Sequence, residues 1–195
     1  MQREIGIALR ATLATLVLTG ILYPLAMTGL ARVVASDQAA GSLVTDERGQ
    51  VVGSALIGQS FTRPGYLWPR PSAAGAGWDG TASGGSNLGT TAQKLHDRAA
   101  TEVERLRAAN PDATDQVPAE LVAASASGLD PHLSPAAALW QAPRVARARK
   151  VDPARVRAVI ESQIEDRTLG FLGEPRVNVL LTNLALDRHF GRARE

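Results

Sequence analysis

The sequence predicts an α+β (mixed α/β) fold, a single domain anchored by one N-terminal transmembrane helix. Three observations lead to this prediction. Residues 11–31 carry no charged side chain, and the chain behind them mixes short apolar runs typical of strands with amphipathic stretches typical of helices. These elements do not alternate strictly, as a doubly wound parallel sheet would require. A chain of 195 residues, 45% of them hydrophobic and 21% charged, has the composition and size of one folded domain with an appendage.

The uncharged segment 11–31 has the length of a membrane anchor, since about 20 apolar residues span the hydrocarbon core of a bilayer. A cleaved secretory signal is the alternative, because the small residues at 33–35 would suit a cleavage site. Signal cores are usually about 7–15 residues long, so the length favours an uncleaved helix. Pro24 lies within the segment and predicts a kink or a close helix contact.

The charges that flank this segment predict its orientation. Arg3 and Arg10 precede it, whereas only Arg32 follows it closely. By the positive-inside rule, residues 1–10 form a cytoplasmic tail and residues 36–195 form an extracytoplasmic domain. We therefore expect a single-pass protein of the cell (inner) membrane, with the lipid bilayer as one of its partners.

The first half of the body contains two predicted elements and one long loop. Residues 42–62 hold two short apolar runs around the turn "DERGQ", which indicates a hairpin or two short strands. Residues 63–91 are rich in Gly, Pro, Ser and Thr and form an irregular loop, a type of segment that is usually functional or mobile when it is this long. Apolar residues at helical spacing over 91–109 predict a helix that ends before Asn110 and Pro111.

In the second half of the body, residues 117–150 are predicted to form a short strand, a tight loop and then a helix that starts at about Ser134. A further helix over 152–168 is opened by Asp152 as its N-cap and by Pro153. Apolar residues at 177, 179 and 181 alternate, which favours a strand that closes the sheet.

Charge and composition exclude several classes of function. The sequence pI of about 9.5 suggests nucleic-acid binding, but acidic and basic residues are equal in number from Asp37 onward. A neutral body lacks the long-range attraction that binding to a phosphate backbone requires, so no nucleic-acid partner is expected. The absence of cysteine excludes disulfides, thiolate metal sites and a cysteine nucleophile.

No catalytic or metal-binding set emerges from the motifs. The two lysines, Lys94 and Lys150, do not follow glycine, so there is no P-loop. Ser127, Asp130 and His132 are too close in sequence to converge readily on one substrate atom, and they are too few for a metal site. We predict no catalytic residue and no metal ligand in this chain.

Three groups of motifs, in order along the chain, carry a resemblance to a known family. They are "GSALIGQSF" with "YLWPRPS" and "SGGSNLG"; "SGLDPHLSPAAALWQAPRVARAR"; and "LGFLGEPRVNVLLTNLALD". Together with the anchor, these segments resemble KdpC, the family of C subunits of the bacterial potassium-transporting Kdp ATPase. The resemblance covers essentially the whole chain.

This resemblance implies a non-catalytic subunit of a complex that imports K⁺ at the expense of ATP. The implied partners are a channel-like subunit that binds and conducts the transported K⁺, and a P-type ATPase subunit that hydrolyses ATP. The family role is to assemble these subunits and to act as a catalytic chaperone that raises the affinity of the ATPase subunit for ATP. The alternative is a structural extracytoplasmic cap at the outer mouth of the channel subunit, without nucleotide contact.

The same resemblance, with the glycine-rich segment, suggests candidate ATP contacts. Backbone N–H groups of consecutive glycines can form an anion-binding nest, and a glutamine amide can pair with an adenine edge. The alternative is a flexible turn ahead of the 91–109 helix, with Ser86 or Thr90 as its cap. Because ATP is cytoplasmic, direct contact also conflicts with the predicted export of the body. The candidates are Ser83, Gly84, Gly85, Ser86, Asn87 and Gln141.

The remaining candidates are residues of the long loop and of "SGLDPH" that could dock onto partner subunits. Aromatic side chains are common at such contacts, and Pro131 fixes a bend. The interface candidates are Tyr66, Trp68, Trp78, Gly128, Leu129, Asp130, Pro131 and His132.

Overall fold

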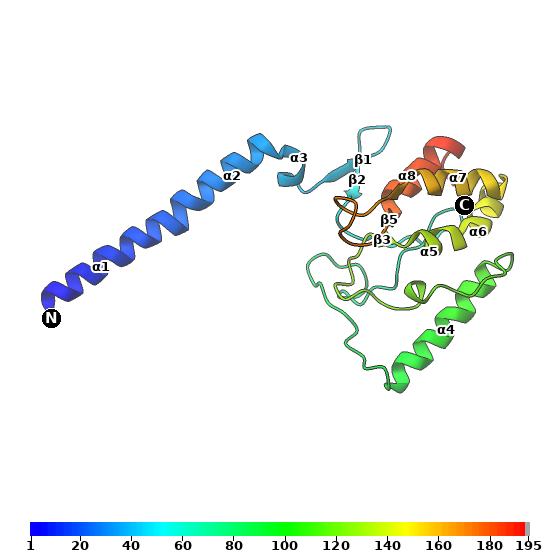
Figure 1. Ribbon diagram of the computed structural model, residues 1–195, viewed down its shortest axis with the longest axis horizontal. Coiled ribbons are helices and arrows are strands. Elements are labelled where there is room, and N and C mark those ends of the chain that lie inside the picture. The colour runs from blue at the N-terminus through cyan, green and yellow to red at the C-terminus, as the bar shows by residue number, and fades with distance from the viewer. Residues whose placement is uncertain (194–195) are drawn as a thin grey trace. The chain divides into compact units, whose positions relative to one another are not determined.

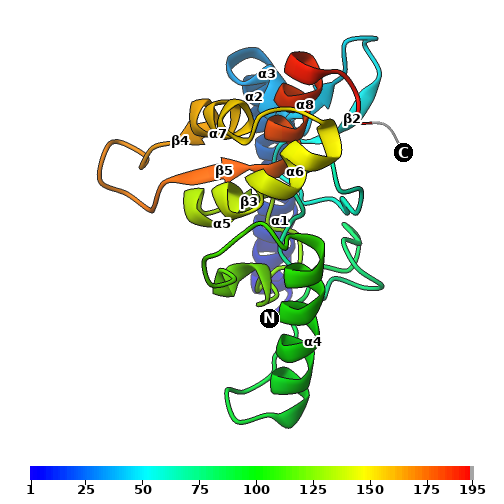
Figure 2. The same ribbon diagram turned by 90° about the vertical axis from the view of Figure 1, so that its right-hand side faces the viewer.

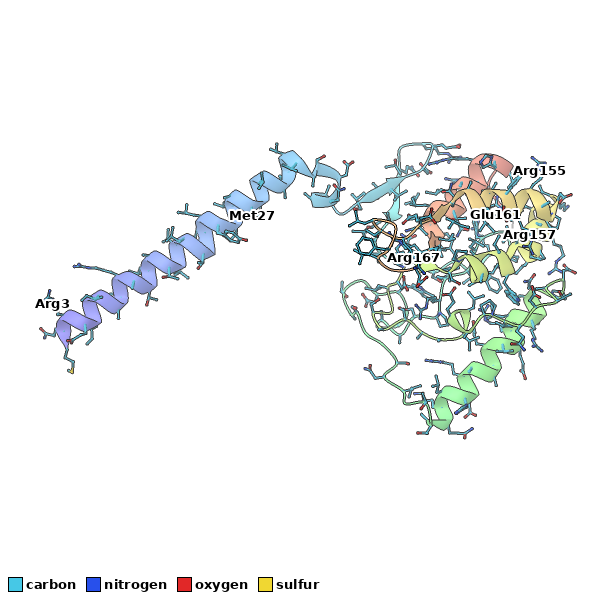
Figure 3. The ribbon with its side chains drawn as sticks, in the orientation of Figure 1. Arg3, Met27, Arg155, Arg157, Glu161 and Arg167 are labelled. Atoms are coloured by element: carbon cyan, nitrogen blue, oxygen red, sulfur yellow. The ribbon has the colours of Figure 1, made fainter. Side chains whose placement is uncertain are left out.

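The computed structural model describes residues 1–193 and divides the chain into two units, Met1–Leu43 and a second that begins at Val44. The first unit is dominated by one continuous helix, drawn in blue in Figure 1, built from α1 (Gln2–Val17), a π-helical turn η1 (Leu18–Leu22) and α2 (Tyr23–Val34). Over its 33 residues an 18-residue window reaches a mean hydropathy of 1.9, with none of that window buried. Side chains project along the whole length of this helix, Arg3 and Met27 among them (Figure 3). The helix is long and apolar enough to span a membrane.

The π-helical turn lies just before Pro24. Proline has no N–H, and in a regular helix its ring would clash with the carbonyl four residues earlier, that of Gly20. The backbone widens instead, so that the N–H of Tyr23 donates to the carbonyl oxygen of Leu18. A local widening of this kind is a known response of a helix to proline. A short helix, α3 (Ser36–Ala39), follows α2.

The second unit opens with the expected hairpin. Strands β1 (Leu43–Thr45) and β2 (Val51–Ser54) form a two-stranded sheet. The carboxylate of Asp46 accepts hydrogen bonds from the N–H groups of Arg48 (2.9 Å) and Gln50 (3.0 Å), which fixes the turn between them. The prediction for residues 42–62 is confirmed.

From residue 55 to residue 92 the chain forms neither helix nor strand, as predicted for most of this range. Helix α4 (Gln93–Ala109) follows and ends at Asn110, before Pro111. Only Leu106 on α4 is fully buried, so this helix joins the core through its C-terminal end. The N-cap of α4 is Ala92, which makes no side-chain cap bond, so the expected cap by Ser86 or Thr90 is wrong.

The core lies between a three-stranded antiparallel sheet and the helices that follow α4, and Leu106 of α4 packs into it as well (Figures 1 and 2). Sheet order is β3-β5-β4, with Leu133 and Ile164 both opposite Val177. The elements are η2 (Ala119–Leu121), β3 (His132–Leu133), α5 (Pro135–Trp140), α6 (Ala142–Arg149), α7 (Pro153–Ser162), β4 (Ile164–Glu165), β5 (Arg176–Asn178) and α8 (Val179–Phe190). The predicted α+β class and the apolar N-terminal helix are confirmed.

Caps explain where these helices begin. Ser134 and Asp152 accept hydrogen bonds from the backbone of the first turns of α5 and α7, and each is followed by proline. The cap was predicted for Asp152, whereas for Ser134 the prediction was only that a helix begins there. Helix α5 ends at Trp140 and α6 begins at Ala142, with Pro143 in its first turn, so the single helix expected from Ser134 is two helices. Helix α7 ends at Ser162, and Ile164 pairs in the sheet instead of continuing the helix predicted to 168.

The C-terminal strand is shorter than predicted, and the short strand expected at the start of 117–150 is a 3₁₀ turn, η2. The strand β5 ends at Asn178, whose side chain accepts a hydrogen bond from the N–H of Leu181 (3.1 Å) and so caps α8. Buried residues of α8 then follow a helical spacing, with Val179, Asn183 and Leu186 on the inner face. The alternation at 177, 179 and 181 was therefore a misleading signal.

Asn178 also donates from Nδ2 to the carbonyl oxygen of Ala55 (2.8 Å), so one buried side chain both caps α8 and holds the chain after β2. We expect Asn178→Ala to lower the free energy of unfolding by about 2 kcal/mol, because a cap and a buried hydrogen bond are lost together. Asp152→Ala is the matched control, since the exposed Asp152 only caps α7, and it should cost about 1 kcal/mol. Urea unfolding of the full chain measures both, and equal losses would contradict the double role.

Candidate functional site

The segment "YLWPRPS" is held in the centre of the body by two side-chain amides. Asn183 on α8 accepts a hydrogen bond from the N–H of Leu67 (2.7 Å) and donates to the carbonyl oxygen of the same residue (3.1 Å). Gln141 does the same for Trp68, with bonds of 2.8 Å and 3.0 Å. The two amides thus take the place of a neighbouring β-strand for Leu67 and Trp68, whose backbone groups bond to no other backbone group within residues 1–193.

Arg144, one turn beyond Gln141, reinforces this segment. Its Nη1 donates to the carbonyl oxygens of Pro64 (2.6 Å) and Tyr66 (3.0 Å), and its Nη2 donates to Oε1 of Gln141 (2.5 Å). The guanidinium lies over the ring of Trp68, 3.8 Å from the centroid. Burial, followed by repulsion from Arg105 and Arg147, lowers the pKa of Arg144 to about 9.

A second contact joins the two loops that the sequence singled out separately. The N–H of Gly84 donates to the carbonyl oxygen of Ser127 (2.9 Å), and the hydroxyl of Ser83 donates to the same oxygen (3.0 Å). A Cβ on Gly85 would lie 2.8 Å from the carbonyl oxygen of Ala126. Gly85 therefore allows two backbones to approach closely, which is a use of glycine distinct from an anion nest, whereas a Cβ on Gly84 would meet no atom within 4 Å.

The structure distributes the six candidate nucleotide residues over two places. Ser83, Gly84 and Gly85 lie against the 125–128 loop, whereas Gln141 lies in the core with its amide bonded to Trp68. Gln141 has no exposed surface, so contact with an adenine would require its amide to leave Trp68. Asn87 is exposed and has a positive φ of 49°, and Ser86 is half-buried.

The "SGLDPH" segment connects several parts of the body. The N–H of Gly58 donates to the carbonyl oxygen of Leu129 (2.8 Å), and the N–H of Val179 donates to that of Pro131 (2.9 Å). Arg70 pairs with Asp130 at 3.0 Å, and the N–H of His132 donates to Asp130 (3.0 Å). Burial raises the pKa of Asp130, but the hydrogen bonds from His132 and the charge of Arg70 outweigh it, so the pKa lies below its ordinary value.

Most interface candidates accordingly have partners inside the body. Trp68, Gly128 and Pro131 are buried, and the hydroxyl of Tyr66 donates to Asp187 on α8 (3.0 Å). The half-buried members, which keep some surface for a partner, are Tyr66, Trp78, Leu129, Asp130 and His132.

The sequence reasoning missed an exposed apolar loop at 168–172, between β4 and β5. Leu169 is 79% exposed and Phe171 69% exposed, and a bridge between Thr168 and Leu172 closes the loop. The loop projects beyond the sheet (Figure 2). The signal was present in "LGFLG", in which large apolar residues stand between glycines, but this stretch served only as the start of a family motif.

Fold and site together define a class of protein: an α+β body, with its loops held by buried amides, that follows one apolar helix long enough to span a membrane. The family model described as KdpC, the c chain of the K⁺-transporting ATPase, matches residues 5–188. The chain belongs to the KdpC family.

Curated relatives agree with this assignment over nearly the whole chain. The potassium-transporting ATPase KdpC subunit of Myxococcus xanthus is 67% identical over 184 residues, which cover 94% of this chain and 87% of that protein. The KdpC subunit of Rhodospirillum rubrum is 53% identical over 190 residues, 97% of this chain and 98% of that protein. The KdpC subunit of Methylobacterium nodulans is 51% identical and covers 92% of this chain and 94% of that protein.

Proposed function

We propose that this chain is a non-catalytic subunit of an ATP-driven potassium-import complex of the cell membrane. In that role it assembles the channel-like K⁺-binding subunit with the P-type ATPase subunit and raises the affinity of the ATPase subunit for ATP. The observation that carries the proposal is the family match over residues 5–188, which includes both the apolar helix and the body. The relatives bear the name of a subunit of a potassium-transporting ATPase.

A second candidate is a structural cap at the outer mouth of the channel subunit, without nucleotide contact. The contacts of Gly84 with Ser127 and of Gln141 with Trp68 favour it, because they engage the groups that a nucleotide would need. The location of the body separates the two candidates. An exported body can affect ATP affinity only through the membrane subunits, whereas direct contact requires a cytoplasmic body.

Labelling a single cysteine in intact cells tests the location. The chain has no native cysteine, so Ser86→Cys provides a unique thiol in a half-buried position of the loop. Arg3→Cys, at the opposite end of the membrane helix, is the matched control. We expect a membrane-impermeant maleimide to label position 86 and not position 3. Labelling at position 3 alone would place the body in the cytoplasm and contradict the proposal of a structural cap at the outer mouth of the channel subunit.

The exposed loop 168–172 provides the docking element for assembly, with a partner subunit as its occupant. Exposed apolar residues that gather on one loop mark interaction sites, and the ion pairs Arg167–Glu174 (2.6 Å) and Arg176–Glu165 (3.0 Å) brace the hairpin that carries them. Arg167 lies at this loop (Figure 3). A braced loop changes little on binding, which reduces the entropic cost of docking.

We expect Phe171→Ser to reduce co-purification of this subunit with its partners about tenfold, because a central apolar contact is lost. Phe171→Leu is the control, since it keeps an apolar side chain of similar reach. The measurement is the ratio of subunits after affinity purification of the tagged ATPase subunit from detergent. Because Phe171 is exposed, the thermal unfolding of the free chain should stay unchanged. An unchanged ratio for Phe171→Ser would show that the loop is not the docking element.

A further inference from the structure

Arg144 is a buried cation that has no anionic partner among residues 1–193. The residue is 2% exposed, and its three hydrogen bonds go to two backbone carbonyls and to the amide oxygen of Gln141. No carboxylate within residues 1–193 lies within ion-pair distance of it, and its Nε–H has no acceptor. Burial of a charge is costly unless the charge is paired, so this arrangement calls for a compensating group.

Arg149, on the same helix, shows what a compensated site looks like in this fold. Its side chain is also 2% exposed, and it donates to the carbonyl oxygens of Gly65 (2.7 Å) and Gly191 (2.7 Å). In addition its Nη2 pairs with the carboxylate of Asp187 at 2.8 Å. Two arginine side chains of α6 thus clamp the same loop, and among the carboxylates of residues 1–193 one pairs with Arg149 and none with Arg144.

A surface pocket of about 410 Å³ lies beside Arg144. Its cationic lining includes Arg147, and its walls are the apolar surfaces of Pro64, Trp68, Ala109 and Ala148. Arg105 lies over the ring of Trp68, 4.6 Å from its centroid, and adds a further positive charge nearby. Asp112 and Glu102 pair with Arg147 and Arg105 respectively, each at 2.5 Å, so neither carboxylate serves Arg144.

We propose that this pocket binds an aspartate or glutamate side chain presented by a neighbouring subunit of the complex. The guanidinium of Arg144 would pair with the carboxylate of that side chain. The apolar walls of the pocket would cover the methylene groups that link this carboxylate to the partner's backbone. A free inorganic anion would gain nothing from those walls. The inference rests on the proposed function, because it takes the occupant from the assembled complex.

The occupant is first located by cross-linking in the assembled complex. A photoreactive benzoylphenylalanine replaces Ala148, which lines the pocket, and the cross-linked segment is identified by mass spectrometry. We expect a segment of a partner subunit that contains Asp or Glu. Cross-links to lipid alone, or to segments without an acidic residue, would overturn the proposal.

Charge reversal then tests the interaction. Arg147 is half-exposed, so Arg147→Glu should fold, and we expect it to lower retention of this subunit in the complex about tenfold. Arg157→Glu is the matched control, because Arg157 is exposed on α7 and does not line the pocket (Figure 3). Replacing the cross-linked partner acid by Lys should cause a similar loss, and combining it with Arg147→Glu should restore retention.

Arg144→Lys provides an independent measurement, since it keeps the charge but removes the planar fork that matches a carboxylate. We expect it to make retention more sensitive to salt than in the parent complex. If Arg147→Glu and Arg144→Lys both leave retention unchanged at every salt concentration, the pocket does not hold a partner carboxylate. Retention could also fall in Phe171→Ser and stay unchanged in Arg147→Glu and Arg144→Lys. That result would overturn the inference about the pocket and leave the proposed function standing.

Discussion

Replacement of Gln141 by Ala is expected to lower the free energy of unfolding of the body by about 4 kcal/mol. The amide is fully buried and bonds to both the N–H and the carbonyl oxygen of Trp68. Its loss leaves these two groups and one N–H of Arg144 without a partner, and each unsatisfied buried group costs about 1–3 kcal/mol. A small cavity adds to the loss. Urea unfolding of the full chain in detergent, followed by tryptophan fluorescence, measures the change.

Asn183→Ala is the matched comparison, because Asn183 makes the same pair of bonds to Leu67 on the other side of the segment. Similar losses of stability in both variants are expected if the two amides act as backbone surrogates. A nucleotide role for Gln141 gives a different result: the concentration of ATP that half-saturates the complex would rise for Gln141→Ala and stay unchanged for Asn183→Ala. A stability loss below about 1 kcal/mol for Gln141→Ala would contradict the structural role.

Gly128→Ala is expected to cost about 4 kcal/mol and to separate the two loops that meet beside "SGLDPH". Gly128 has a φ of +68°, where a side chain is strained, and a Cβ there would lie 2.6 Å from the backbone nitrogen of Ala74 and 2.7 Å from the carbonyl oxygen of Gly84. The contacting atoms belong to backbone, so they cannot move aside without shifting a loop. The melting temperature of the full chain measures the effect.

Gly89→Ala is the control, because a Cβ at Gly89 meets no atom within 4 Å and its φ is not positive. We expect its stability to change by about 0.5 kcal/mol or less. Equal melting temperatures for Gly128→Ala and the parent protein would show that the two loops do not pack as described. The comparison also bears on the glycine-rich segment, because Gly84 provides one of the atoms that Gly128 approaches.

For the glycine-rich segment, local sequence alone predicted glycine conformations but not the contact that the segment makes. From "SGGS" alone, an anion nest and a simple turn were both open, since consecutive glycines permit either conformation. The structure adds a partner far away in the chain: Ser127 accepts from Gly84 and Ser83 across more than forty residues of sequence, 44 in the case of Ser83. No local pattern contains that contact.

Secondary structure was predictable where a side chain acts on its immediate neighbours. The helix start at Ser134, the cap at Asp152 and the turn at Asp46 follow from a few adjacent residues, and the structure contains all three. The same local reasoning failed at the end of α7 and at β5, where strand pairing of Ile164 with Val177 ended one helix and the cap Asn178 began another. Pairing between strands depends on long-range contacts, which override local propensity.

By itself the sequence determined the apolar N-terminal helix, the α+β class and membership of the KdpC family, because these depend on hydrophobicity, periodicity and motif order along the chain. Tertiary structure alone decided what the motif residues do. It placed Gln141 and Asn183 on either side of Leu67 and Trp68, and it buried Arg144 without a carboxylate from any of the residues that the structure describes. The physical reason is that burial and hydrogen bonding depend on which distant segments meet, and that is a property of the folded chain.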